Sequence, residues 1–146
     1  MRNVNVFIDE EYEKINEPLC KSIIEKILSY YKYTSYDINV IFTSDIHLSD
    51  LKKEFFYKDQ WTDVIAFPLQ IDSKFIEGEI YISIPTAKKN ANLFKEPYKK
   101  ELGRLIIHGS LHLLGIEDKS KKQKKDMTIL EEKFLYFVWL NIEFLK

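Results

Sequence analysis

Alternation of apolar and polar positions predicts four short β-strands in this chain. In the first of them, Val4, Val6 and Ile8 recur at every second position, as in a strand with one buried face. Pro68 has no amide hydrogen to donate, so we expect the third strand to end there or to lie at the edge of a sheet. The predicted strands are Val4–Asp9, Asp37–Thr43, Asp63–Gln70 and Glu79–Ile84.

Apolar residues spaced three and four apart predict a helix that begins at Pro18. Its buried stripe comprises Leu19, Ile23, Ile24, Ile27 and Leu28. Further helices are predicted from the cap Ser44–Asp45 to Phe56, from Pro85–Thr86 onward, from Pro97 to Leu114, and from about Lys122 through Trp139. This order, β-α-β-α-β-β followed by helices, predicts an α+β fold. We expect a single domain over residues 1–146, in which a small four-stranded mixed sheet packs against several helices.

The composition narrows the classes of protein to which the chain can belong. Hydrophobic residues make up 45% of its 146 residues, which is too many for a disordered chain. Lys and Arg number 22 against 23 Asp and Glu, so the net charge of −1 argues against a globally basic nucleic-acid binder but leaves room for a local basic patch. The lone cysteine excludes an internal disulfide and a four-cysteine zinc ribbon.

Neither end of the chain has the pattern of a targeting or membrane segment. Acidic residues stand at the N-terminus, where a signal peptide needs an apolar core. The most apolar stretch, Phe134–Leu145, is shorter than the ~20 residues that span a bilayer. We therefore expect a cytoplasmic protein that has no membrane partner.

The pattern H-x-x-x-H-x-x-G-x-x-D carries the candidate chemistry. His108 and His112 are four apart on a predicted helix, so both imidazoles lie on one face, one turn apart. Gly115 follows three residues later and is able to reverse the chain in a left-handed conformation, and Asp118 comes three residues after it. Two nitrogens and one oxygen leave a coordination position for water, as a catalytic zinc site requires. The sequence thus predicts a metal site on a central helix and the turn after it.

These residues allow other interpretations. A histidine pair four apart is by itself more often structural than metal-binding, and the glycine and the acid at fixed offsets favour the metal. Glu117 competes with Asp118 as the oxygen ligand, although the spacing favours Asp118. His47, the third histidine, lies far away in the sequence and is expected at the surface or near a helix cap.

The spacing resembles the metzincin motif H-E-x-x-H-x-x-G-x-x-H, with two departures. Gly109 replaces the Glu that acts as general base in those peptidases, and Asp118 replaces the third histidine. A carboxylate also binds zinc, at ~2.0–2.2 Å, so the second change is compatible with a metal site. The first change counts strongly against a peptidase, because it removes the group that would deprotonate water.

Three segments together resemble the YbeY family of bacterial rRNA-maturation endoribonucleases. HGSLHLLG, which begins at His108, is similar to the family signature HGxLHLxGYDH; the other two segments are LKKEFFYKDQWTDVIAFP (Leu51–Pro68) and GEIYISIPTAKKNA (Gly78–Ala91). The resemblance covers nearly the whole chain. It implies an α+β fold, one zinc ion in a cleft, hydrolysis of single-stranded RNA, and a role in rRNA processing and ribosome quality control at the small ribosomal subunit.

The chain departs from the family pattern at a position that bears on activity. The family arginine that is thought to assist RNA cleavage falls at Phe56, although Lys52, Lys53 and Lys58 are near it in the sequence. This departure motivates a second hypothesis, a non-catalytic ribosome-assembly factor that keeps the metal for structure. A metallopeptidase is a third and less favoured hypothesis, because Gly109 stands where such an enzyme has its general-base glutamate.

Two further residues and a basic run are candidates for roles in RNA hydrolysis. Arg104, one turn before His108, is placed to contact phosphate, or alternatively to pair with Glu101. Asp63 is a candidate acceptor for a ligand histidine, or alternatively a strand cap. A dense lysine run follows Asp118 and is either part of an RNA path or a solvated surface; it comprises Lys119, Lys121, Lys122, Lys124 and Lys125.

Overall fold

The computed structural model describes residues 1–56 and 62–140, the last two by their backbone alone. Four strands and five helices follow one another in the predicted order. They are β1 (Arg2–Ile8), α1 (Glu17–Tyr30), β2 (Ser35–Thr43), α2 (Asp45–Phe56), β3 (Val64–Ile71), β4 (Phe75–Ser83), α3 (Ile84–Phe94), α4 (Tyr98–Leu113) and α5 (Lys121–Leu140).

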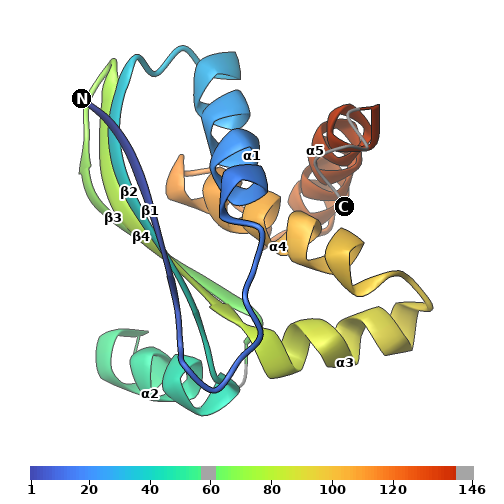
Figure 1. The fold of residues 1–146 in the computed structure, drawn as a ribbon. Helices are drawn as coiled ribbons and strands as arrows, with labels where there is room; N and C mark the ends of the chain where they lie inside the picture. Colours follow the sequence, from blue (N-terminus) through green and yellow to red (C-terminus); the bar gives the residue numbers. More distant parts are fainter. Residues whose placement is uncertain (57–61, 141–146) are drawn as a thin grey trace.

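The strands form one mixed sheet in the order β1-β2-β4-β3, which confirms the predicted α+β class (Figure 1). β1 pairs with β2, and β2 with β4, in parallel, whereas β3 runs antiparallel to β4. β3 is therefore an edge strand, as Pro68 predicted, and the pairing register shifts between Pro68 and Gln70.

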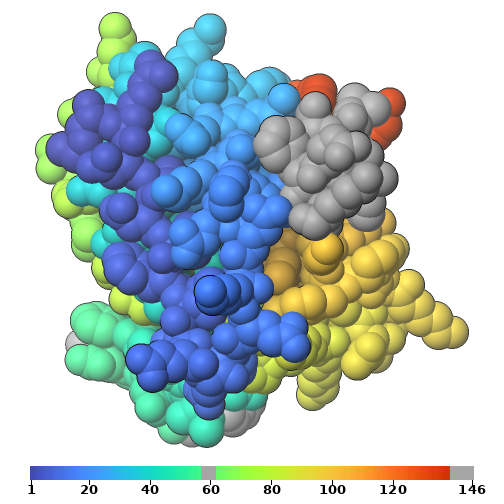
Figure 2. Space-filling model, viewed as in Figure 1, coloured from blue at the N-terminus to red at the C-terminus, as the bar shows by residue number. Residues whose placement is uncertain are grey.

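Helices α1, α4 and α5 lie on one side of the sheet, while α2 and α3 lie at the end where β2 and β4 stop (Figure 1). Alternate residues of the central strands point toward the helices and are fully buried, among them Ile38, Val40, Ile80 and Ile82. In the space-filling view, α1 and the segment before it lie in front of α4 and hide much of it (Figure 2). Of the sixteen residues of α4, ten are buried. Because the helix is packed in this way, the directions of its histidines are fixed relative to the sheet.

The prediction for β4 was incomplete. The strand begins at Phe75, four residues earlier than the expected Glu79, so Gly78 lies inside the strand rather than before it. A Cβ at Gly78 would lie 2.5 Å from a methyl carbon of Leu113 and 2.8 Å from the carbonyl oxygen of Phe67. The glycine thus lets α4 and the edge strand approach β4 closely, which no local pattern in the sequence indicates.

Within the described part of the chain, no helix combines the length and the apolar character needed to cross a membrane.

Gly109 brings α4 onto the sheet beside the site described below. A Cβ at this position would lie 2.6 Å from Cγ2 of Ile80 and 2.9 Å from Cγ2 of Val64, closer than packed side chains allow. At this position α4 therefore has no room for a side chain, and a glutamate would have to displace the sheet.

We expect Gly109→Ala to lower the free energy of unfolding by about 1–3 kcal/mol, because the added methyl group overpacks the contact with β3 and β4. Gly103→Ala, in the same helix, is the matched control. Its Cβ would meet only Leu135, at 3.5 Å, so alanine there should raise the free energy of unfolding by roughly 0.5–1 kcal/mol through helix propensity. Urea unfolding followed by circular dichroism distinguishes the two variants, and equal effects would contradict the close packing.

Candidate metal centre

The end of α4 brings three ligand-type side chains to one point. The helix stops at Leu113, where the amide of Gly115 donates to the carbonyl of His112 at 2.9 Å and that of Ile116 to the carbonyl of Leu111 at 3.1 Å. Gly115 has φ +90°, a conformation that L side chains rarely adopt, and this reverses the chain. Asp118 is thereby returned toward the histidines of the helix that precedes it.

The three side chains have the separations that a small metal ion needs. Nε2 of His108 and Nε2 of His112 are 2.9 Å apart. Oδ2 of Asp118 lies 3.4 Å from the first of these nitrogens, and Oδ1 lies 3.4 Å from the second. A zinc ion bound tetrahedrally at ~2.1 Å separates its ligand atoms by about 3.4 Å. The carboxylate–imidazole distances equal this separation, whereas the two imidazole nitrogens are closer and would move apart around an ion. The donor set therefore fits one zinc-sized ion, with at least one position left for another ligand.

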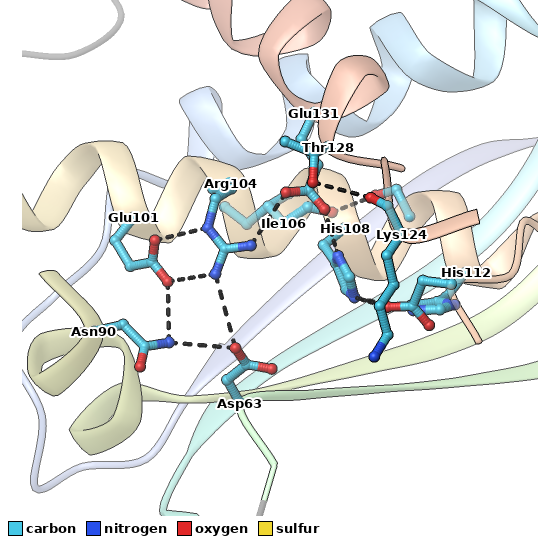
Figure 3. Close-up of polar contacts among 12 residues, drawn as sticks. Asp63, Asn90, Glu101, Arg104, Ile106, His108, His112, Lys124, Thr128 and Glu131 are labelled. Carbon is cyan, nitrogen blue, oxygen red and sulfur yellow. Dashed lines mark hydrogen bonds and ion pairs between the residues drawn. The ribbon is translucent and has the colours of Figure 1, made fainter. Parts of the chain in front are cut away.

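A carboxylate from another helix orients the first histidine. Nδ1 of His108 lies 2.5 Å from Oε2 of Glu131, a residue of α5 (Figure 3). Glu131 is only 5% exposed. A carboxylate accepts hydrogen bonds, so Nδ1 of His108 carries the proton and its Nε2 lone pair faces the ligand cluster. Glu131 thus fixes both the tautomer and the plane of the ring.

Arg104 holds this carboxylate in place from the other side. Its Nη1 donates to Oε1 of Glu131 at 3.1 Å, while Nε and Nη2 form a two-point contact with Glu101 at 2.8 and 2.7 Å (Figure 3). Burial by itself would lower the pKa of the Arg104 guanidinium, but the hydrogen bonds and charges of Glu101 and Glu131 outweigh it and hold that pKa above its usual range. The ion pair between Arg104 and Glu101, one of the two predicted roles of Arg104, is present in the structure. The guanidinium also pairs with Glu131.

Asp63 closes the network at the end of the cleft. Its Oδ2 accepts from Nδ2 of Asn90 at 3.2 Å and lies 3.8 Å from Nη2 of Arg104, and Asn90 also donates to Glu101 at 3.1 Å. Among the described residues its carboxylate contacts these two side chains and neither histidine. Three carboxylates, on Asp63, Glu101 and Glu131, thus contact the Arg104 guanidinium, and Asp118 adds a fourth at the histidines. This excess of negative charge favours a cation at the histidines.

Burial is the largest influence on the second histidine. It lowers the pKa of His112, the neighbouring His108 lowers it further, and Asp118 opposes both. A lowered pKa keeps the imidazole neutral near pH 7, the state in which its nitrogen is a metal ligand.

An open cleft of about 580 Å³ lies in front of the ligand cluster. Its floor carries the two histidines, and its walls come from the end of α2, the start of β3 and the turn after α4. The residues that give the cleft its chemistry are Lys52, Phe56, Asp63, Asp118 and Lys119.

The structure brings together the three predicted ligands and leaves Glu117, the competing oxygen ligand, outside their cluster. Glu117 is 56% exposed in its side chain and lies 3.8 Å from Nζ of Lys119, away from the histidines. His47 is exposed near the start of α2, where its amide donates to the capping hydroxyl of Ser44 at 3.1 Å. The lysines of the run after Asp118 are all exposed, and Lys119 among them lines the cleft, whereas Lys58 lies outside the described residues.

Sequence reasoning missed Glu131 and underrated Glu101. Both are buried carboxylates on the otherwise apolar faces of their helices. Glu131 stands four residues after the buried Met127 and three before the buried Phe134. A charged residue inside a helical apolar stripe was the available signal, because such a residue is rarely buried without a partner.

The chain matches known proteins over most of its length. The family described as "Endoribonuclease YbeY" matches residues 5–138. A relative of that name from Cytophaga hutchinsonii is 36% identical over 85% of this chain and 87% of its own length. Another of that name, from Karelsulcia muelleri, is 33% identical over 92% and 95%. The solution structure of TM1509 from Thermotoga maritima aligns with a TM-score of 0.67 at 29% identity, covering 97% of this chain and 92% of the other.

We expect Glu131→Gln to weaken zinc binding by about 10- to 100-fold, because glutamine keeps the size of the side chain but loses the charge that orients His108. Competition with a chromophoric chelator measures the affinity. Glu132→Gln removes a charge from the exposed neighbour on the same helix and should leave the affinity unchanged. A Glu131→Gln variant that binds zinc as tightly as the unmodified protein would refute the orienting role.

Proposed function

The chain belongs to the YbeY family of endoribonucleases, and on that premise we propose that it is a zinc-dependent endoribonuclease that cleaves single-stranded RNA during rRNA maturation. The observation that carries this proposal is the convergence of His108, His112 and Asp118 at the floor of an open cleft. Such a donor set, with a position left for another ligand, is typical of hydrolytic rather than purely structural zinc sites.

In this proposal His108, His112 and Asp118 hold the ion. When bound, zinc supplies a Lewis acid that polarises a phosphoryl oxygen and lowers the pKa of water to about 7. Two imidazoles and a carboxylate suit several divalent metals, and the proposal of zinc rests on this donor set and on the family.

The surrounding residues act through the ligands or on the substrate. Glu131 keeps the proton of His108 on Nδ1, and Arg104, bound between Glu101 and Glu131, is a positioning residue that keeps this carboxylate in place. Asp63 lines the cleft with one side of its carboxylate fixed by Asn90, where it is placed to accept a proton or a hydroxyl hydrogen bond from the substrate. Lys119 adds a positive charge at the cleft wall, where RNA phosphates would pass.

The second function is a non-catalytic assembly factor for the small ribosomal subunit, which Phe56 favours because no guanidinium stands at that position of the cleft. A peptidase is disfavoured on steric grounds, since Gly109 faces the sheet at a position where a glutamate base has no room. Either ribosomal function acts on RNA or protein of the small subunit in the cytoplasm.

We expect the purified protein to carry about one zinc ion per chain and to cleave single-stranded RNA slowly. His108→Ala should lose the metal and slow cleavage by more than ~100-fold, because the Lewis acid is lost. His47→Ala is the matched control, since this histidine is exposed and lies outside the cleft, and it should change neither property. Elemental analysis and cleavage of a labelled oligonucleotide measure the two.

Two results would contradict parts of the proposal. Equal zinc content in His108→Ala and in the unmodified protein would refute the metal site. A fully metallated protein that binds small ribosomal subunits but leaves RNA intact would refute the nuclease and favour the assembly factor.

A further inference from the structure

An exposed aromatic ring stands at the mouth of the cleft. Phe56, the last residue of α2, is 40% exposed and lines the same cleft as His108 and His112. The walls near it are otherwise formed mainly by small, aliphatic or charged side chains. What distinguishes Phe56 from other exposed apolar side chains is its place in the cleft that holds the metal ligands.

The ring of Phe56 is held from behind by the sheet. Its centroid is 5.6 Å from that of Phe67 on β3, at an interplanar angle of 31°. Phe67 in turn meets Tyr81 on β4 edge-on, with centroids 5.7 Å apart. A chain of aromatic contacts thus anchors Phe56 on two strands, which gives a partner a rigid surface and lowers the entropy lost on binding.

Lys52 supplies a cation at the same place. Its Nζ lies 5.0 Å from the centroid of the Phe56 ring, one helical turn away on α2, and the side chain also lines the cleft. An exposed contact of this kind is weaker than the stacking of a nucleobase on an aromatic ring. A nucleobase stacked on this ring would therefore displace the ammonium group, whose flexible stem would let it reach a phosphate of the same strand.

Phe55, the neighbour of Phe56 on α2, provides a matched comparison. This neighbour is 55% exposed and contacts Phe67 with centroids 5.4 Å apart, yet it does not line the cleft. The two adjacent rings thus share one support, and of the two it is Phe56 that lines the cleft.

We propose that Phe56 is a stacking platform for a nucleobase of single-stranded RNA bound in the cleft, and that Lys52 binds a phosphate next to that base. The proposal rests on the proposed function for the choice of RNA as ligand. A single arginine is able to stack on a base and contact a phosphate. Here an aromatic side chain would supply the stacking and a cationic one the phosphate contact. The platform tolerates any base, because every base has a π face.

Fluorescence anisotropy with a labelled single-stranded RNA tests the platform. The zinc-loaded protein is used, and a gel verifies that the RNA remains intact during the titration. Phe56→Ala should weaken binding by about 5- to 100-fold, the range for loss of one stacked base, while Phe56→Trp should restore it. On an oligomer of abasic ribose phosphate of the same length, Phe56→Ala should change nothing. Phe55→Ala is the matched control and should bind RNA normally.

The lysine is tested through the salt dependence of the same binding. Lys52→Ala should reduce the slope of log K against log salt by about 0.7, the contribution of one phosphate contact on a single strand. Lys53→Ala, the exposed neighbour that does not line the cleft, should leave the slope unchanged.

The outcomes separate this proposal from the nuclease. Equal losses for Phe56→Ala on RNA and on abasic oligomer, equal losses for Phe56→Ala and Phe55→Ala, or normal RNA binding by Phe56→Ala would each overturn the platform, even if the protein cleaves RNA. Base-dependent binding through Phe56 in a fully metallated protein that never cleaves RNA would support the platform and overturn the nuclease.

Discussion

Glu131 carries a negative charge into the contact between α4 and α5, where only 5% of its surface meets water. A carboxylate removed from water is strongly destabilising unless hydrogen bonds and opposite charge surround it. Nδ1 of His108 and Nη1 of Arg104 meet this need, one at each oxygen. Arg104, partly buried in its turn, requires Glu101. The orientation of His108 thus follows from the need of the buried Glu131 carboxylate for hydrogen bonds. His108 and Arg104, which supply them, both lie on α4.

Such a network contributes geometry more than stability. Replacing a buried ion pair by apolar side chains is often neutral, whereas removing one partner is costly. Its benefit here is that His108 has one tautomer and one ring plane before any ion arrives, so little reorganisation accompanies binding. The same helix is pressed on the sheet through Gly109, which fixes the histidines relative to β3 and excludes the general base of a peptidase. Gly109 and His112 are three residues apart on neighbouring positions of one side of α4, so the contact that packs the helix on the sheet also places its ligands.

The parts of this structure that local patterns encode were predictable. Alternation placed the strands, Pro68 marked the edge strand, and the spacing of His108, His112, Gly115 and Asp118 identified the cluster that the fold assembles. The missed features depend on elements distant in the chain. Gly78, inside β4, fits closely under Leu113, Glu131 contacts His108 from another helix, and Phe56 packs on Phe67 of β3. No window of the sequence contains both partners of these contacts.

The central claim is that two imidazoles and one carboxylate, prearranged by Glu131, form the metal centre. X-ray absorption at the zinc edge of the loaded protein tests it most directly, because imidazole and sulfur ligands scatter differently. We predict two imidazoles with oxygen ligands at ~2.0–2.1 Å, and one imidazole in the His112→Ala variant. A sulfur ligand at ~2.3 Å, which would have to come from Cys20 at its distant buried position, or an imidazole count unchanged by His112→Ala, would contradict the account.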